Sequence, residues 1–139
     1  MTRVQDGIYQ MLAATTEVTS RLSTYRGKPA IFTRNRIPGD AVPRYCVIED
    51  ALGDSPWDTK TTRGREVLHD IKFLDFESGD PSLVQDAAEF ARDVLHRGPG
   101  ITVSGYGTLI AVVSGPIAVP SDDQTYGRVI TARFNLIQA

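Results

Sequence analysis

The apolar residues near the start of the chain recur every three or four positions, at Val4, Ile8, Met11 and Leu12. This spacing places them on one face of a helix, so the pattern predicts a helix over residues 2–14. Val18 and Leu22 either extend that helix or form a short second one, because a pair of threonines interrupts the pattern.

A second helix is predicted over Pro81–Leu95. Asp80 is a favourable N-cap residue and Pro81 suits the first helical position, while Gly98 follows the end as a stop signal. Apolar residues recur through the segment with a helical period, and polar residues fill the opposite side. The segment therefore has one apolar face that can pack against a sheet.

Alternating apolar and polar positions predict strands in the middle and at the end of the chain. The strand Arg65–Ser78 places mostly apolar side chains on one face: Val67, His69, Ile71 and Phe73. Tyr126–Leu136 alternates in the same way, and we expect its core-facing residues to include Ile130, Ala132, Phe134 and Leu136. Further strands are predicted within the segments Pro29–Thr33, Tyr45–Glu49 and Ile101–Ser114.

Two turn-rich segments, Gly53–Gly64 and Gly115–Thr125, are predicted to form extended hairpin loops. Hairpins would then join most of the strands, so we expect a mainly antiparallel sheet with two helices packed on one face. The predicted fold class is α+β, in a single domain that covers residues 1–139.

The composition fits one globular domain of 139 residues, with 41% hydrophobic and 23% charged residues. The longest apolar run, Thr108–Ser114, is far shorter than the ~20 residues that cross a bilayer, so no membrane association is predicted. The first residues lack the apolar core of a secretory signal. The single cysteine, Cys46, allows no intrachain disulfide, and we expect its thiol to be buried in a strand.

The net charge of −2 argues against a dedicated nucleic-acid-binding protein, but the charges are unevenly distributed. Six basic residues and one acidic residue lie between Arg21 and Arg44, whereas eight acidic and two basic residues lie between Glu66 and Asp93. These clusters form either an ordinary solvated surface or two complementary patches that meet between subunits.

The residues that usually carry catalysis or bind metals form no recognisable motif. His69 and His96 have no metal-ligating partner at i+2 or i+4, so we expect structural roles, with His96 complementing a helix C-terminus. The spacing of a calcium loop is missing from the acids around the central loop, Glu49, Asp50, Asp54 and Asp58. The sequence therefore predicts no catalytic, metal-binding or cofactor-binding residues and no enzymatic activity.

One large aromatic residue, Trp57, stands among polar residues in the segment Gly53–Gly64. Such a residue either folds back onto its own domain or fills a pocket on a neighbouring molecule, as aromatic residues at interfaces do. Both interpretations stay open at this point.

Four segments resemble, in their order and spacing, the tail-completion or tail-terminator family of long-tailed phages: Val47-Ile48-Glu49-Asp50, Trp57-Asp58-Thr59-Lys60-Thr61, the strand Glu66–Phe76 and the helix Pro81–Leu95. Relatives of that family also occur in prophages and in phage-like gene transfer agents. The resemblance covers nearly the whole chain, including the helix Arg3–Ala14. The stretch Arg21–Arg36 departs from it, because it is more basic and less rich in glycine than the family pattern.

The resemblance implies a structural virion protein without a cofactor. It implies a ring, most often a hexamer, at the head-proximal end of the tail tube, where the ring stops tube polymerisation and offers a docking surface to the head. The implied partners are further copies of the chain, the major tail-tube protein and the head–tail connector or stopper protein. DNA would pass through the lumen without being read. Assembly would occur in the host cytoplasm, and the protein would stay in the tail–neck region of the virion.

If the resemblance holds, contacts with other subunits or with the tail tube would come from the central hairpin and the two charged stretches. The expected interface residues are Trp57, Asp58, Lys60, Thr61, Arg63, Arg34, Arg36, Asp75 and Glu77. One alternative is another neck component, a head–tail stopper or adaptor. The alternative from a different class is a small α+β enzyme or ligand-binding domain, with His69, Glu49 and Asp50 near a cleft.

Overall fold

Five strands form the central sheet of the structure, a computed structural model that describes residues 2–33, 44–58, 63–76, 81–96, 101, 103, 106–119 and 125–138. Across the sheet, the strands follow the order β3 (Ile31–Thr33), β4 (Tyr45–Asp58), β5 (Arg63–Phe76), β7 (Thr125–Gln138) and β6 (Tyr106–Val119). The pair β3–β4 is parallel and the other three pairs are antiparallel, which confirms the predicted mainly antiparallel sheet.

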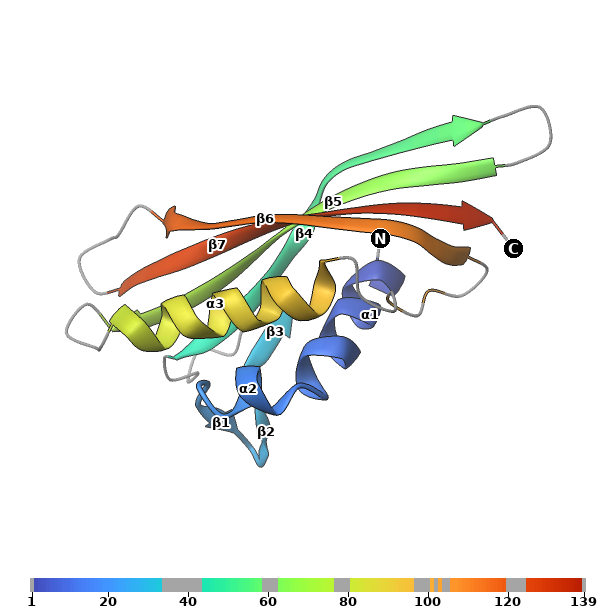
Figure 1. The fold of residues 1–139 in the computed structure, drawn as a ribbon. Helices are drawn as coiled ribbons and strands as arrows, with labels where there is room; N and C mark the ends of the chain where they lie inside the picture. Colours follow the sequence, from blue (N-terminus) through green and yellow to red (C-terminus); the bar gives the residue numbers. More distant parts are fainter. Residues whose placement is uncertain are drawn as a thin grey trace.

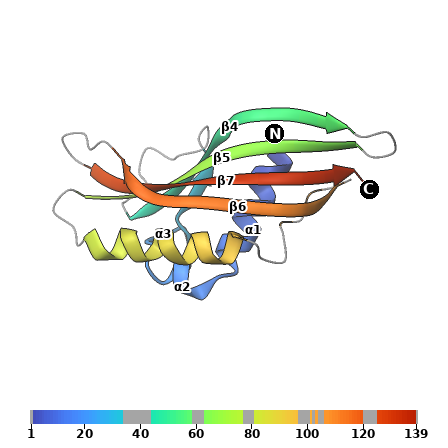
Figure 2. The ribbon, with the colours of Figure 1, turned by 45° about the horizontal axis from the view of Figure 1, so that its top comes forward.

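The helices α1 (Thr2–Ala13), α2 (Thr16–Thr19) and α3 (Pro81–Leu95) lie on one face of this sheet (Figures 1 and 2). The two predicted helices are therefore present within a residue of their expected bounds, and α2 is an additional short one. A small hairpin of β1 (Thr24–Tyr25) and β2 (Lys28–Pro29) follows α2. The fold is α+β, as predicted.

The core lies between the helices and the sheet, and the alternation in the sequence identifies its residues. The four predicted inward positions of β5 are fully buried: Val67, His69, Ile71 and Phe73. The same holds for Ile130, Ala132, Phe134 and Leu136 of β7. The helices contribute buried residues at their predicted apolar positions, among them Val4, Ile8, Leu12, Val84 and Ala91. Cys46 is also buried, in β4, as expected.

The two predicted hairpin loops are mostly strand. β4 and β5 stay paired out to Asp58 and Arg63, and β6 continues through Gly115 to Val119. The glycines and prolines that suggested turns lie instead in strands at the edges of the sheet. Pro56 lies in the part of β4 beyond the residues that pair with β3, where the described strands leave its outer edge uncovered and a missing N–H is tolerated. The Gly115–Pro116 step coincides with a shift of register in the edge strand β6.

The β4–β5 hairpin and the strands beside it run past the layer of helices at one end of the molecule (Figures 1 and 2). The opposite face of the sheet carries none of the three helices. These two features, a projecting hairpin and a sheet face that none of the described helices covers (the open face), leave exposed strand residues such as Val112 and Arg133 available for contacts with other molecules.

A shift of register in β4 between Ile48 and Ala51 explains two buried polar side chains. The carbonyl of Glu49 in this bulge accepts a hydrogen bond from Nε2 of Gln5 at 3.1 Å. It also accepts one from Nδ1 of His69 at 2.9 Å. His69 therefore has the structural role that was expected, because it helps to satisfy a carbonyl that the irregular ladder leaves exposed.

His96 has a different role from the one expected. Its Nδ1 accepts a hydrogen bond from the backbone N–H of Val113 at 3.0 Å, so it joins the end of α3 to β6 as an acceptor. Arg92, one turn earlier, donates to the carbonyl of Gly115 at 3.0 Å. Together these side chains satisfy backbone groups of an edge strand and tie α3 to it.

Candidate assembly surface

The predicted interface residues of the central hairpin lie at its projecting end. Trp57 is paired with Gly64 and Asp58 with Arg63 at the last described positions of β4 and β5. Arg63 is exposed. The other predicted interface residues of the loops lie outside the described residues: Lys60, Thr61, Arg34, Arg36 and Glu77.

Asp75 is the predicted interface residue that lies inside the molecule. It pairs with Tyr126 across β5 and β7, and only 3% of its surface is exposed. Asp75 therefore does not contribute to the exposed surface of the molecule. Its position follows from the strand parity, since Asp75 continues the inward-facing series that ends in Ile71 and Phe73.

Paired polar side chains cross the uncovered face of the sheet. Nζ of Lys72 lies 3.2 Å from Oε1 of Glu49, and Nε of Arg133 lies 3.4 Å from Oε1 of Glu66. Between these pairs, Thr131 donates a hydrogen bond to Oδ1 of Asp70 at 2.7 Å. The described charged side chains of this face are therefore nearly balanced, whereas Leu68 and Val129, which share the outward parity of β5 and β7, are apolar.

A cavity of about 230 Å³ opens on this face above β5, β7 and β6. Its walls are the side chains of Leu68, Val112, Ser114, Thr131 and Arg133. Val112 is more than a third exposed, and farther along β6 Ile117 is 63% exposed. Apolar surface is therefore exposed on this sheet face beside the polar pairs.

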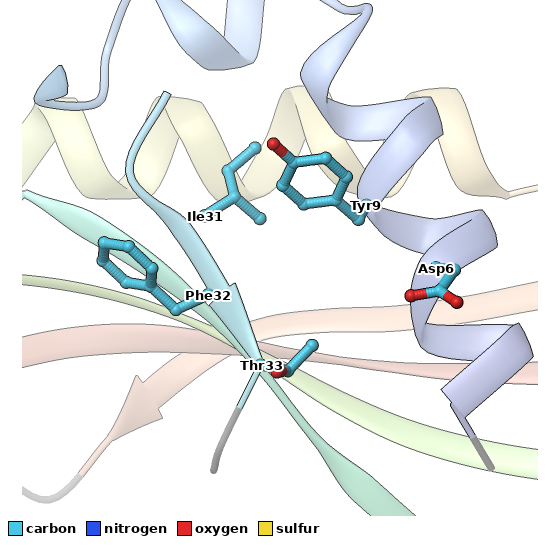
Figure 3. Close-up of a pocket in the computed structure, with 5 residues that line it drawn as sticks. All are labelled: Asp6, Tyr9, Ile31, Phe32 and Thr33. Atoms are coloured by element: carbon cyan, nitrogen blue, oxygen red, sulfur yellow. The ribbon is translucent and has the colours of Figure 1, made fainter. Parts of the chain in front are cut away.

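A second cavity, of about 310 Å³, lies between α1 and the edge strand β3 (Figure 3). Tyr9 and Ile31 point toward one another across it, and Asp6 lies farther along α1. Phe32 on the same strand packs against Tyr25 and Tyr45, with ring centroids 5.7 and 5.9 Å apart.

This second cavity offers little chemistry. Among the described residues, its lining consists of Asp6, Tyr9, Ile31, Phe32 and Thr33, which include one carboxylate and no histidine, cysteine or lysine. His69, Glu49 and Asp50, the candidate acid–base residues of the sequence analysis, do not line this cavity. His69 is instead buried against the backbone of Glu49. Glu49 and Asp50 lie in the β-bulge of β4, and the side chains of Gln5 and His69 stabilise this bulge by hydrogen bonds to the carbonyl of Glu49.

The two oppositely charged stretches meet within the chain at one point. Nε of Arg21 lies 4.0 Å from Oδ2 of Asp86 on α3. The Arg21 guanidinium also lies 4.6 Å from the ring centroid of Phe90, one turn along the same helix. The part of the basic stretch that leads into β1 therefore helps to hold α2 against α3.

Within the described part of the chain, no three His, Cys, Asp or Glu side chains gather closely enough to hold a metal ion. None of the helices described is both long and apolar enough to span a membrane.

No family model matches the sequence, and no curated protein matches it. The fold is that of a chain in a gene transfer agent virion. That chain belongs to the solved structure of the virion of a native gene transfer agent particle, and it aligns with a TM-score of 0.79 at 15% sequence identity. The alignment covers 98% of the present chain and 96% of the other, so the two share their architecture almost from end to end.

Sequence reasoning missed the apolar positions on the outer surface. Leu52, 63% exposed, falls between Ala51 and Gly53, where the register of β4 shifts, so no alternation of residues could assign it a side. The cavity on the open face depends on how β5, β7 and β6 align with one another. The sequence carries no local signal for that alignment.

Proposed function

We propose that this chain is a structural protein of a tailed virion, of the phage or gene-transfer-agent type. The observation that carries the proposal is the shared fold, over 98% of the chain, with a chain of a gene transfer agent virion. The order of the sequence segments resembles that of the tail-terminator family. This resemblance supports the same assignment independently, because it rests on the residues and not on the fold.

Within that class, the role we propose is a ring, a hexamer, at the head-proximal end of the tail tube. The ring ends tube polymerisation and provides the surface for head joining. Its partners are further copies of the chain, the major tail-tube protein and the head–tail connector or stopper. The protein assembles in the host cytoplasm and resides in the tail–neck region.

The surfaces of the chain suit a ring. A cyclic ring needs two different, complementary surfaces on each subunit. Here a projecting hairpin and an uncovered sheet face lie on different parts of the same molecule (Figure 1). The nearly balanced charge of the open face, with its Lys72–Glu49 and Arg133–Glu66 pairs, also suits a conduit that DNA passes without being retained.

Deletion of the gene tests the proposed role. Particles from the deletion strain are examined by negative-stain electron microscopy, with a complemented strain as the control. We expect tails of irregular or excessive length that fail to join filled heads. Tails of normal length that still join heads would overturn the proposal.

Another neck component, a stopper or adaptor, is the second candidate. The fold expected for such a component differs from the one described, because stoppers are more barrel-like and adaptors are more helical than an open sheet with three helices. Chemical cross-linking in purified particles separates the roles. Links to the tail-tube protein support the terminator, whereas links confined to the portal side support the other components.

A further inference from the structure

β6 is an edge strand with the composition of an interior strand. Among the described strands, β6 ends the sheet and is paired on one side only, with β7. Its 14 residues include no Asp, Glu, Lys or Arg, and a continuous apolar run, 109–113, lies within it. An uncharged apolar strand with an unpaired edge is a template to which another chain can add a strand.

The opposite edge of the sheet carries its protection in its own sequence. β4 pairs with β3 only over residues 46–48, and the described strands leave the rest of its outer edge unpaired. The rest of β4 has two shifts of register, a proline and several acidic residues, among them Glu49, Asp50 and Asp54. Charges, proline and bulges are common devices that prevent an edge from pairing with another sheet.

The regular part of β6 lacks these devices. Its two shifts of register lie between Thr108 and Ile110 and between Ser114 and Ile117, so the ladder with β7 is regular from Ile110 to Ser114. This regular part coincides with most of the apolar run. Protection of this part of the edge therefore has to come from another element.

The last turn of α3 supplies that protection. In an antiparallel ladder, alternate residues direct their backbone groups to opposite sides of the strand. The N–H of Val113 bonds to Nδ1 of His96 at 3.0 Å and not to β7, so it faces the outer edge. Two residues later, the carbonyl of Gly115 accepts from Nη1 of Arg92 at 3.0 Å. These are backbone groups that an added strand would need.

The two side chains are held in place by the helix. Arg92 and His96 are four residues apart, so they lie on the same side of α3. α3 packs against β6 and β7, and Ala91 and Leu95 in the same turn are buried in the core (Figure 2). Asp93 accepts from Nε of Arg92 at 3.1 Å. The turn is thus fixed against the edge that it covers.

We propose that Arg92 and His96 close the outer edge of β6 against strand addition by a second copy of this chain. The excluded partner is the same edge of the other copy, because two uncharged apolar edges can pair without burying a charge. Such a contact is two-fold and joins two copies only, unlike the contacts of a ring. The inference goes beyond the proposed function, since it concerns the free subunit.

Removal of both side chains tests the inference. The double variant Arg92→Ala and His96→Ala loses the two edge bonds and retains the core residues of α3. Sedimentation velocity compares it with the native protein at equal concentrations. We expect a shift to species of about twice the native mass, as a two-fold contact between copies requires.

A conservative double variant is the matched control. In Arg92→Lys with His96→Asn, an ammonium group can still donate to the carbonyl of Gly115, and an amide oxygen can still accept from the N–H of Val113. We expect this variant to sediment like the native protein. Circular dichroism confirms that both double variants fold.

A charge on β6 distinguishes strand pairing from an altered fold. Val112 is 37% exposed and pairs with Arg133 on β7, so Val112→Glu places a carboxylate beside a guanidinium in the native sheet. When two β6 edges pair, the carboxylates of both copies would lie at the contact and repel each other. Added to the double-alanine variant, Val112→Glu should therefore restore the native sedimentation.

Three results would overturn the protective role. The first is a double-alanine variant that sediments like the native protein. The second is association that persists after Val112→Glu is added, and the third is equal association of the conservative variant, because either would show a cause other than the open edge. None of these results bears on the proposed ring, which the deletion experiment tests by itself.

Discussion

Cys46 illustrates how a single buried residue makes stability depend on pH. It lies on the helix-facing side of β4, and burial raises the pKa of its thiol far above the ordinary range. The folded protein therefore keeps this thiol protonated at pH values where the unfolded chain forms the thiolate. Ionisation favours the unfolded state, so this contribution to stability is complete below the unfolded pKa and is lost as the pH rises above it.

We expect the advantage of the native protein over Cys46→Ala to shrink above pH 8.5 by about 1.4 kcal/mol per pH unit. Urea denaturation of both proteins between pH 7 and 10 measures it, and the comparison cancels the titration of other groups. The thiol should also react with a disulfide reagent only after unfolding. A constant stability difference, or a rapid reaction in the folded state, would contradict this account.

His69 provides a second prediction at this scale, because it donates a hydrogen bond to the carbonyl of Glu49 in the bulge of β4. His69→Leu should lower the free energy of unfolding by about 0.5–1.5 kcal/mol, the usual contribution of one hydrogen bond, since Nε2 of Gln5 still donates to the same carbonyl. Chemical denaturation measures the change. Glu17→Ala, at an exposed site, is the control and should change stability by less than about 0.5 kcal/mol. Equal stabilities of His69→Leu and the native protein would refute the role.

At the scale of elements, the strands with strict alternation could be predicted over nearly their whole length, whereas β4 and β6 could be predicted only in part, within Tyr45–Glu49 and Ile101–Ser114. β5 and β7 lie inside the sheet with one face on the helices, so burial imposes a period of two on their sequence. Among the described strands, β6 ends the sheet and β4 is paired on one side only beyond Ile48, and Pro56 and the Gly115–Pro116 step are tolerated at such edges. In the sequence those residues have the composition of loops, which explains why both segments were predicted to be loops.

Gly127 tests how closely β5 and β7 pack. A Cβ atom built at this residue would collide with the carbonyl oxygen of Phe73, whereas one at Gly107 would lie 3.7 Å from Ile137, an ordinary contact. Gly127→Ala should therefore destabilise the fold by about 1–3 kcal/mol through strain in the sheet. Gly107→Ala, the matched control on β6, should have a small effect. Thermal unfolding measures both, and comparable losses in the two variants would contradict the packing described.

At the scale of the whole molecule, the architecture and the assembly surfaces differ in how far the sequence determines them. The helices and inner strands follow from periodic burial, and the same architecture occurs in a gene transfer agent virion chain at 15% identity. The surface features outside the core depend on the bulges in β4 and β6 and on the alignment of neighbouring strands, for which no local pattern exists. Many sequences can therefore satisfy the fold, while each assembly can use its own surface residues.

A reconstruction of the head–tail junction by cryo-electron microscopy tests the central claim most directly. Particles from producing cells should show a closed ring of six copies of this chain between the tail tube and the head connector. Density at this position that another protein accounts for, with the chain absent from the particle, would contradict the account.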